Sequence, residues 1–170
     1  MFFIINVAVA EKNHYEAALR AFNQQDIETA YIHLKNALQH SERNLPAKLL
    51  LAKVLIAKHS YISAEQELND LLDEGVDNNL IVFPLGESIL NQGKFFKALS
   101  FAKKMTLKKE GKLAYRRIKA RAYISLEDWD NAIIEYQAIL INYVNDIDAL
   151  LGLATVYIYQ KKNIKAKVFL

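Results

Sequence analysis

Apolar residues along this chain are grouped in stretches with the spacing of an α-helix. Within each stretch they fall three or four positions apart, so that they share one face of a helix with about 3.6 residues per turn. Short polar segments separate the stretches, among them NQQD at 23–26, NQGK at 91–94 and LEDWD at 126–130. This alternation predicts pairs of antiparallel helices joined by tight turns.

The same pattern returns at a constant interval along the chain. An alanine stands in this register at Ala30, Ala64, Ala98, Ala132 and Ala166. Another small residue precedes each of them by twelve positions, at Ala18, Ala52, Gly86, Ala120 and Ala154. Small residues let neighbouring helix backbones approach closely, and larger residues fill the grooves beside them. Because a lone hairpin cannot bury both of its faces, the columns predict a stack of hairpins.

The segment WDNAIIEYQAIL at 129–140, together with the 34-residue period, resembles the tetratricopeptide repeat. The resemblance implies an all-α fold, a right-handed superhelical solenoid of antiparallel helix pairs, over residues 11–170. The expected units are 11–44, 45–78, 79–112, 113–146 and a partial unit at 147–170. Two features depart from the family pattern. The proline expected near the end of each unit is absent, and Lys119 stands where other units have leucine.

Both ends of the predicted repeat are apolar. Residues 1–10, MFFIINVAVA, are interpreted as a hydrophobic cap on the first helix, with the remnant of a secretory signal as the alternative. At the other end, no polar capping helix follows Leu170. We therefore expect a fragment of a longer repeat protein, or an end face through which copies of the chain associate. No apolar run is long enough to predict a transmembrane segment.

The two prolines fall at different places in the predicted helices. Pro46 is expected at a helix start, where a missing amide donor costs nothing. Pro84 falls within the first helix of the third unit. Its cost is small if that helix begins near Leu80 or Ile81, and otherwise a kink is expected.

A narrower resemblance comes from three longer strings. HLKNAL at 33–38, KLLLAKVLIAKHSYISAEQEL at 48–68 and VFPLGESILNQGKFFKAL at 82–99 resemble the bacterial tetratricopeptide-repeat lipoproteins of exosortase (PEP-CTERM) systems. This resemblance implies a protein of the bacterial cell envelope or periplasm, rather than the cytoplasm, that works in protein sorting or exopolysaccharide export. The cysteine that anchors those lipoproteins has no counterpart here.

Composition narrows the functions that are open. Hydrophobic residues make up 52% and charged residues 24% of the chain, as in a folded protein, and the net charge of +3 calls for neither nucleic acid nor an anionic membrane. The lack of cysteine excludes thiolate metal sites and cysteine nucleophiles. None of His14, His33, His40 and His59 has metal-ligand spacing, and no phosphate-binding loop or nucleophile elbow occurs. The sequence therefore predicts no metal, no cofactor and no enzyme.

Clustered acids also have a structural interpretation. In the stretch DWDNAIIEY at 128–136, Asp128 and Asp130 are expected to cap a helix start, and Glu135 is expected to face solvent. Helical spacing places Glu67 and Asp70 on a polar stripe, which is typical of a solvated helix face. Neither group indicates acid–base chemistry.

The segment 103–121 is strongly basic. Its lysines at 108–112 are expected in a loop between units, and Arg117 and Arg121 lie four apart on the next helix. Two interpretations stay open for this arginine pair. It binds a carboxylate or phosphate bidentately, or it is solvated or forms ion pairs with neighbouring units. Nucleic acid is not expected, because no aromatic residues interleave with the basic ones beyond Tyr115 and Tyr123.

These observations predict a non-catalytic interaction scaffold. We expect its concave surface to bind an extended peptide or a partner protein, with binding of an anionic ligand or nucleic acid by residues 103–121 as the alternative. Register alone gives the groove-facing candidates, which are Tyr15, Asn23, Lys53, Asn91, Arg117 and Arg121.

Overall fold

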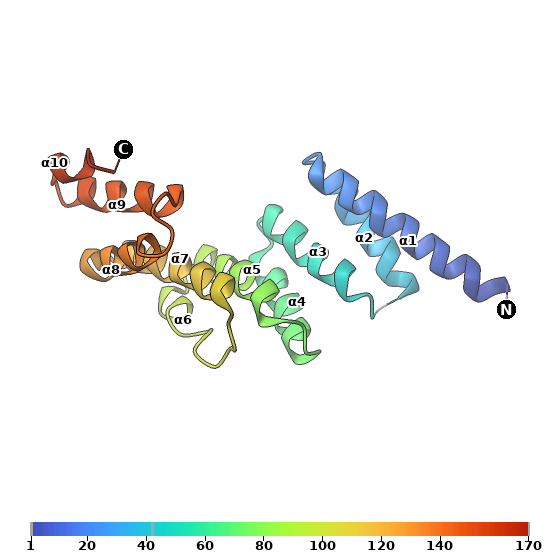
Figure 1. The fold of residues 1–170 in the computed structure, drawn as a ribbon. Coiled ribbons are helices and arrows are strands. Elements are labelled where there is room, and N and C mark those ends of the chain that lie inside the picture. Colours follow the sequence, from blue (N-terminus) through green and yellow to red (C-terminus); the bar gives the residue numbers. More distant parts are fainter. Residues whose placement is uncertain (1, 42, 170) are drawn as a thin grey trace. The chain divides into compact units, whose positions relative to one another are not determined.

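The computed structural model describes residues 2–41 and 43–169, with the side chains of 2–12, 40 and 163 excepted. Within those residues every regular element is a helix and no strand occurs, so the predicted all-α class is confirmed (Figure 1). By its internal contacts the chain divides into two compact units, Met1–Asp77 and Asn78–Leu170. The division falls at the junction of the second and third predicted repeats. One continuous solenoid over 11–170 stays a prediction.

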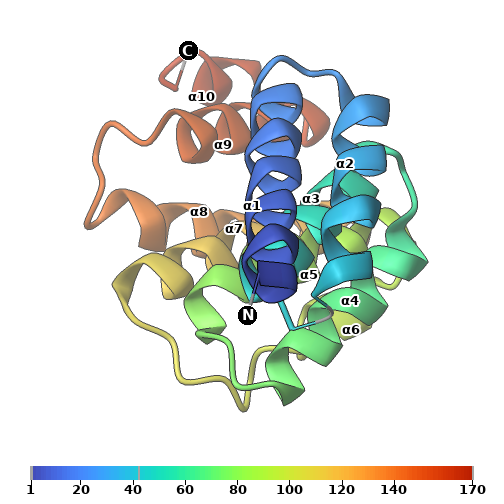
Figure 2. The ribbon, with the colours of Figure 1, turned by 90° about the vertical axis from the view of Figure 1, so that its right-hand side faces the viewer.

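The first compact unit contains two helical hairpins. Helix α1 (Phe2–Asn23) packs along α2 (Ile27–His40), and α3 (Leu45–Ala57) packs along α4 (Tyr61–Asp73). Helix α2 also contacts α3, which joins the hairpins around one core (Figures 1 and 2). The backbone of the apolar segment at 2–10 belongs to α1 itself. Its side chains, on which the predicted cap depends, lie outside the described residues.

The second compact unit contains three hairpins. They are formed by α5 (Asn78–Asn91) with α6 (Phe95–Ala98), α7 (Lys109–Ser125) with α8 (Trp129–Leu140), and α9 (Ile147–Tyr159) with α10 (Asn163–Ala166). Helix α7 contacts α5 and α8, and α8 contacts α9. The second helices of all five hairpins begin at a constant interval, at positions 27, 61, 95, 129 and 163. Helix α7 begins at Lys109, so the prediction that 108–112 form a loop is wrong for 109–112.

The two small-residue columns are buried along the whole chain. Each column alanine exposes at most 2% of its surface. Gly86, the one glycine among them, shows why the positions are small. A Cβ built on Gly86 would lie 2.6 Å from Ile118 Cγ1, closer than atoms can approach. The predicted close contacts between helices are therefore present, as ridges-into-grooves packing requires.

A left-handed residue ends the first helix of every hairpin. These residues are Gln25, His59, Gly93, Glu127 and Lys161, with φ between 57° and 72°. At the first turn, Gln25 N donates to Phe22 O at 3.0 Å and Asp26 N donates to Ala21 O at 2.9 Å. The same pair of bonds recurs at the other four turns. This is the Schellman arrangement, which satisfies the last carbonyls of one helix and aligns the chain for the next.

Short acids cap helix starts, among them the predicted Asp128, whereas Asp130 lies in the first turn of α8. Asp128 accepts a hydrogen bond from Asn131 N, and Asp146 accepts one from Ala149 N. Pro46 lies in the first turn of α3, as expected. Pro84 lies further inside its helix than the favourable case, because α5 begins at Asn78. Its ring leaves the Leu80 carbonyl without the usual amide donor.

Helix α6 is a single turn, where the repeat predicts a longer helix. The Tyr115 hydroxyl donates to the Leu99 carbonyl at 2.7 Å, and that carbonyl would accept from Lys103 N in a continued helix. Lys103 N instead donates to Ser100 O. Ala98 and Ala102 are still buried in the positions that the register requires. The chain thus keeps the packing of the second helix and loses its regular backbone.

Candidate functional site

A pocket of about 440 Å³ lies among the helices of the second compact unit. Helices α7 and α9 supply most of its lining, and α5 and α8 supply one residue each. The lining residues are Phe83, Arg117, Arg121, Ile124, Tyr136, Asp148, Leu151, Gly152 and Thr155. Eight of the nine belong to the first helices of successive hairpins, so the pocket is a product of the repeat.

The repeat register explains why these side chains meet. Phe83, Arg117 and Leu151 stand one repeat apart from each other and occupy the same position on α5, α7 and α9. Arg121 and Thr155 occupy the position four residues later, which lies on the same helix face. The buried small residue between the two positions, such as Ala120, fixes that face relative to the core. Helices α7 and α9 therefore present the same two positions to the pocket, and α5 presents the first of them.

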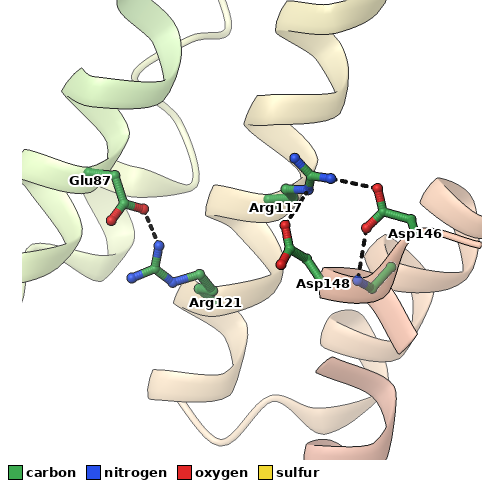
Figure 3. Close-up of polar contacts among 6 residues, drawn as sticks. Glu87, Arg117, Arg121, Asp146 and Asp148 are labelled. Carbon is green, nitrogen blue, oxygen red and sulfur yellow. Dashed lines mark hydrogen bonds and ion pairs between the residues drawn. The ribbon is translucent and has the colours of Figure 1, made fainter. Parts of the chain in front are cut away.

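Arg117 ties α7 to the start of α9. Its Nη2 lies 2.5 Å from Asp146 Oδ2, and its Nε lies 3.5 Å from Asp148 Oδ2 (Figure 3). The Asp146 side chain is only 8% exposed, and its other oxygen caps α9 by accepting from Ala149 N at 3.0 Å. One carboxylate thus binds both a guanidinium and a helix N-terminus, which makes this pair more than a surface contact.

Arg121 contacts the preceding first helix, α5, whereas Arg117 contacts the following one, α9. Its guanidinium forms an ion pair with Glu87 of α5, while the Arg121 side chain is 45% exposed (Figure 3). The two arginines therefore link α7 to both neighbouring first helices. Of the two interpretations that the sequence leaves open, the ion pairs with neighbouring units are present. A ligand-binding role for the pair stays a prediction.

The floor and walls of the pocket are apolar. Phe83 is 44% exposed and Leu151 51% exposed, while Tyr136 is buried behind them. Burial raises the pKa of the Tyr136 phenol, so it is a neutral hydroxyl at physiological pH. Gly152 makes room for this ring, since a Cβ there would lie 2.2 Å from Tyr136 Cζ. The site is an apolar hollow bordered by paired charges.

The six predicted groove residues have different surroundings. Arg117 and Arg121 line the pocket. Asn91 is exposed at the end of α5, where its amide donates to the Glu87 carbonyl at 2.8 Å. In the first compact unit, Tyr15 packs against the core, whereas Asn23 and Lys53 are exposed. For these four residues, a place in a binding groove stays a prediction.

Sequence reasoning missed the apolar part of the site. Phe83 and Leu151 stand one repeat before and one repeat after Arg117, and Thr155 stands one repeat after Arg121. Extending the columns of the two arginines by one repeat in each direction finds all three. The repeat spacing in the sequence therefore contained this information. Selecting residues by positive charge finds only the two arginines and passes over the apolar residues at the equivalent positions.

Glu135 does not face solvent, so that prediction is wrong. It is 7% exposed, accepts from Arg116 Nη1 at 2.7 Å and forms a second ion pair with Lys119. The cause is Lys119 itself, a cation in a column that elsewhere holds the buried leucines Leu51, Leu85 and Leu153. A cation drawn into a hairpin needs a carboxylate partner, and Glu135 supplies it.

The histidines form a contact that the spacing along one helix did not predict. His14 and His33 lie on neighbouring helices of the first hairpin with their Nδ1 atoms 3.1 Å apart. Across the described residues, no three histidine or acidic side chains gather as a metal site would require. The same part of the chain contains no helix whose length and apolarity would let it span a membrane.

Comparisons with known proteins agree with this architecture. The tetratricopeptide repeat family model matches residues 10–81. MamA (residue 41 to its end) from Desulfovibrio magneticus RS-1 is similar in structure with a TM-score of 0.76, at 14% identity over 94% of this chain and 90% of that one. TTC0263, a tetratricopeptide-repeat protein of Thermus thermophilus, has a TM-score of 0.73 at 15% identity, over 94% of this chain and 87% of that one.

A third structure is described as YrrB, a tetratricopeptide-repeat protein with an unusual peptide-binding site. It has a TM-score of 0.64 at 18% identity, covering 92% of this chain and 80% of that chain. No curated protein matches the sequence. The resemblance to tetratricopeptide repeats and the helical repeat fold are thus confirmed, whereas an exosortase association has no counterpart among these matches.

Proposed function

We propose that this chain is a non-catalytic interaction scaffold whose α7–α9 pocket binds a peptide segment of a partner protein. The observation that carries the proposal is the exposure of Phe83 and Leu151 beside a pocket whose arginines are already paired. Exposed apolar side chains around a hollow are typical of a surface that a partner covers. The repeat fold supports the proposal, since stacked hairpins present such extended surfaces.

The chemistry of the pocket defines the peptide that fits. Its volume of about 440 Å³ and its apolar walls suit one large side chain, such as leucine or phenylalanine. Arg121 and Asp148, which are both well exposed at the rim, offer a donor and an acceptor to the peptide backbone or to polar neighbours. Because rim charges of both signs are present, the peptide needs no strong net charge.

The ionisable groups of the pocket are arranged for holding a ligand. Both arginines are engaged by carboxylates, and Tyr136 stays protonated at neutral pH. Among the described residues that line the pocket, none pairs a nucleophile with a base, which acyl or phosphoryl transfer would need. The proposal therefore assigns recognition and no reaction to this site.

The test uses peptides selected for binding to the full chain from a displayed random library. Leu151→Glu places a charge in the pocket and is expected to weaken a selected peptide tenfold or more, by roughly 1.4 kcal/mol. Ile134→Glu, at an exposed apolar position on α8 outside the pocket, is the matched control. Affinity is measured by fluorescence anisotropy, with circular dichroism as a check on folding. Equal affinity of the two variants for the peptide would contradict binding at the α7–α9 pocket.

Two finer proposals rest on the sequence alone. The resemblance to exosortase-associated lipoproteins supports a partner in a bacterial envelope export, sorting or exopolysaccharide system. Cell fractionation of the full-length protein tests this, and recovery in the cytoplasm alone would count against it.

Association between copies of the chain is the second proposal. Light scattering at increasing concentration would contradict it if the mass stays that of a monomer.

A further inference from the structure

A second pocket, separate from the α7–α9 pocket, is strongly basic. It lies between α7 and α8, has a volume of about 310 Å³, and shares no lining residue with the α7–α9 pocket. Lys109, Lys112, Arg116 and Lys119 line it from one face of α7, at helical spacings of three and four residues. None of the described residues that line it is an acid. A cavity lined by charges of one sign attracts a ligand of the other, here an anion.

Only part of this charge is balanced within the protein. Glu135 forms ion pairs with both Arg116 and Lys119, so one carboxylate serves two cations. Among the described residues, no acid forms an ion pair with Lys109 or Lys112. The pocket is therefore left with uncompensated positive charge on one helix, which repels itself unless an anion binds.

Aromatic rings hold two of the lysines at the pocket. Lys109 Nζ lies 5.0 Å from the centre of the Tyr143 ring, and Lys119 Nζ lies 5.4 Å from that of Tyr115. Such cation–π contacts restrict the long side chains before any ligand arrives, which lowers the entropy cost of binding. The Tyr115 hydroxyl is fixed in turn by the Leu99 carbonyl. The protein's own side chains thus position these cations at the pocket.

Lys119 departs from the pattern of the repeat. The column of Lys119 is leucine in three other hairpins, where each leucine is at most 3% exposed. The equivalent of Arg116 is Val82 in the third hairpin and Leu150 in the fifth, whereas the second hairpin has Lys48, which forms an ion pair with Glu74. A hairpin that served packing alone would keep an apolar residue in the column of Lys119, because a buried ion pair is seldom more stable than apolar packing. Lys119 is therefore a cation that the packing of the repeat does not require.

We propose that the α7–α8 pocket binds an acidic peptide segment, with aspartate or glutamate carboxylates reaching Lys109 and Lys112. The apolar floor formed by Leu113 and Ile139 accepts an aliphatic side chain next to those acids. The rings of Tyr115 and Tyr143 are covered by lysines, and Phe101 packs edge-on against Tyr115. They are not open platforms on which bases could stack, so the arrangement favours a peptide over a nucleic acid.

The test measures binding of a fluorescent short peptide of alternating glutamate and leucine to the full chain. We expect the double variant Lys109→Ala/Lys112→Ala to weaken binding about tenfold or more, the loss typical of removing charge-assisted hydrogen bonds. The matched control is Lys103→Ala/Lys104→Ala, which removes the same charge from two exposed lysines outside the pocket and should leave affinity nearly unchanged. A peptide with glutamine in place of glutamate should bind far more weakly.

Further measurements distinguish binding at this pocket from binding at the α7–α9 pocket, and the acidic peptide from other ligands. Leu151→Glu should leave binding of the acidic peptide unchanged, so that failure of the α7–α9 proposal and failure of this one are distinguishable. Equal losses in the two lysine double variants would overturn the proposal in favour of general charge attraction. It would also be overturned if the glutamine peptide binds equally well, or if only a single-stranded oligonucleotide binds and loses affinity in the Lys109/Lys112 variant.

Discussion

A left-handed backbone closes each helical hairpin, yet glycine occupies only one of the five positions. An L-residue with a Cβ costs roughly 1–2 kcal/mol in this conformation. Gln25, His59, Glu127 and Lys161 therefore carry local strain that Gly93 avoids. The strain is tolerated because the two Schellman hydrogen bonds and the following helix hold the turn in place.

The difference between Gly93 and the other turn residues predicts opposite effects on stability when glycine is removed at one turn and introduced at another. Gly93→Ala should destabilise the chain by about 1 kcal/mol, and the loss comes from the backbone, since a Cβ at Gly93 meets nothing within 4 Å. Glu127→Gly relieves the strained conformation and should be neutral or stabilising by up to about 1 kcal/mol. Urea unfolding of both variants measures the difference, and a Gly93→Ala variant as stable as the parent would contradict the account of the turns.

Tyr115 predicts a stability change at alkaline pH. Burial, reinforced by the charges of Glu135 and Tyr123, raises the pKa of Tyr115 from 10.0 to about 12. Between these two values the unfolded chain loses a proton that the folded chain keeps, so this contribution to stability is present below pH 10 and is lost as the pH rises. Unfolding midpoints across that range should fall more steeply for the parent than for Tyr115→Phe. Parallel curves would count against a raised pKa for the half-buried Tyr115 phenol.

The contacts of single side chains were the part of the structure that the sequence predicted least completely. Helix caps such as Asp128 were predictable, because short acids before a helix bind free amides wherever they occur. The burial of Glu135 was not, because it depends on Arg116 and Lys119 reaching it from the neighbouring helix. An ion pair across two helices requires side-chain positions that periodicity does not supply.

At the scale of helices, close contacts between small residues hold the hairpins together. Ala98 is fully buried in α6. Ala98→Leu inserts extra atoms into that contact and should destabilise by roughly 1–3 kcal/mol. Lys97→Leu, at the exposed neighbouring position of the same helix, is the control and should change stability little. A melting temperature of Ala98→Leu equal to that of the parent would mean that α6 does not pack as described.

The Glu135 ion pairs predict a second effect between helices. Glu135→Gln keeps the shape of the side chain but leaves Arg116 and Lys119 without their carboxylate. We expect a loss of roughly 1–3 kcal/mol, less than for a fully buried pair because Arg116 is 42% exposed at its side chain. Glu67→Gln, two repeats earlier in the same column, should stay within about 0.5 kcal/mol. Similar losses in both variants would show that Glu135 has no special role.

Helix bounds follow from the sequence except where tertiary contacts intervene. The second helices begin where the repeat register places them, because the turns and caps are local signals. Helix α6 is shorter than the register predicts: the Leu99 carbonyl accepts from the Tyr115 hydroxyl of the next hairpin, and Lys103 N donates to Ser100 O instead. Propensity and register in residues 95–107 contain no sign of that competition.

For the molecule as a whole, the repeat made the helical fold and two of the nine residues that line the α7–α9 pocket predictable. Columns of Arg117 and Arg121 pointed to the surface on which the α7–α9 pocket lies. The pocket itself depends on the ring of Tyr136 filling the space beside Gly152, a contact between α8 and α9 that no single column reveals. Of the two roles left open for the arginine pair, ion pairs with neighbouring helices are present, and a ligand-binding role stays a prediction.

The most direct test of the central claim is a map of amide chemical-shift changes when a selected peptide is titrated into the full, isotopically labelled chain. The account predicts saturable shifts at Phe83, Arg121 and Leu151, with little change at Ile134 on α8. Saturable shifts centred on α8, with residues of the α7–α9 pocket unaffected, would contradict it.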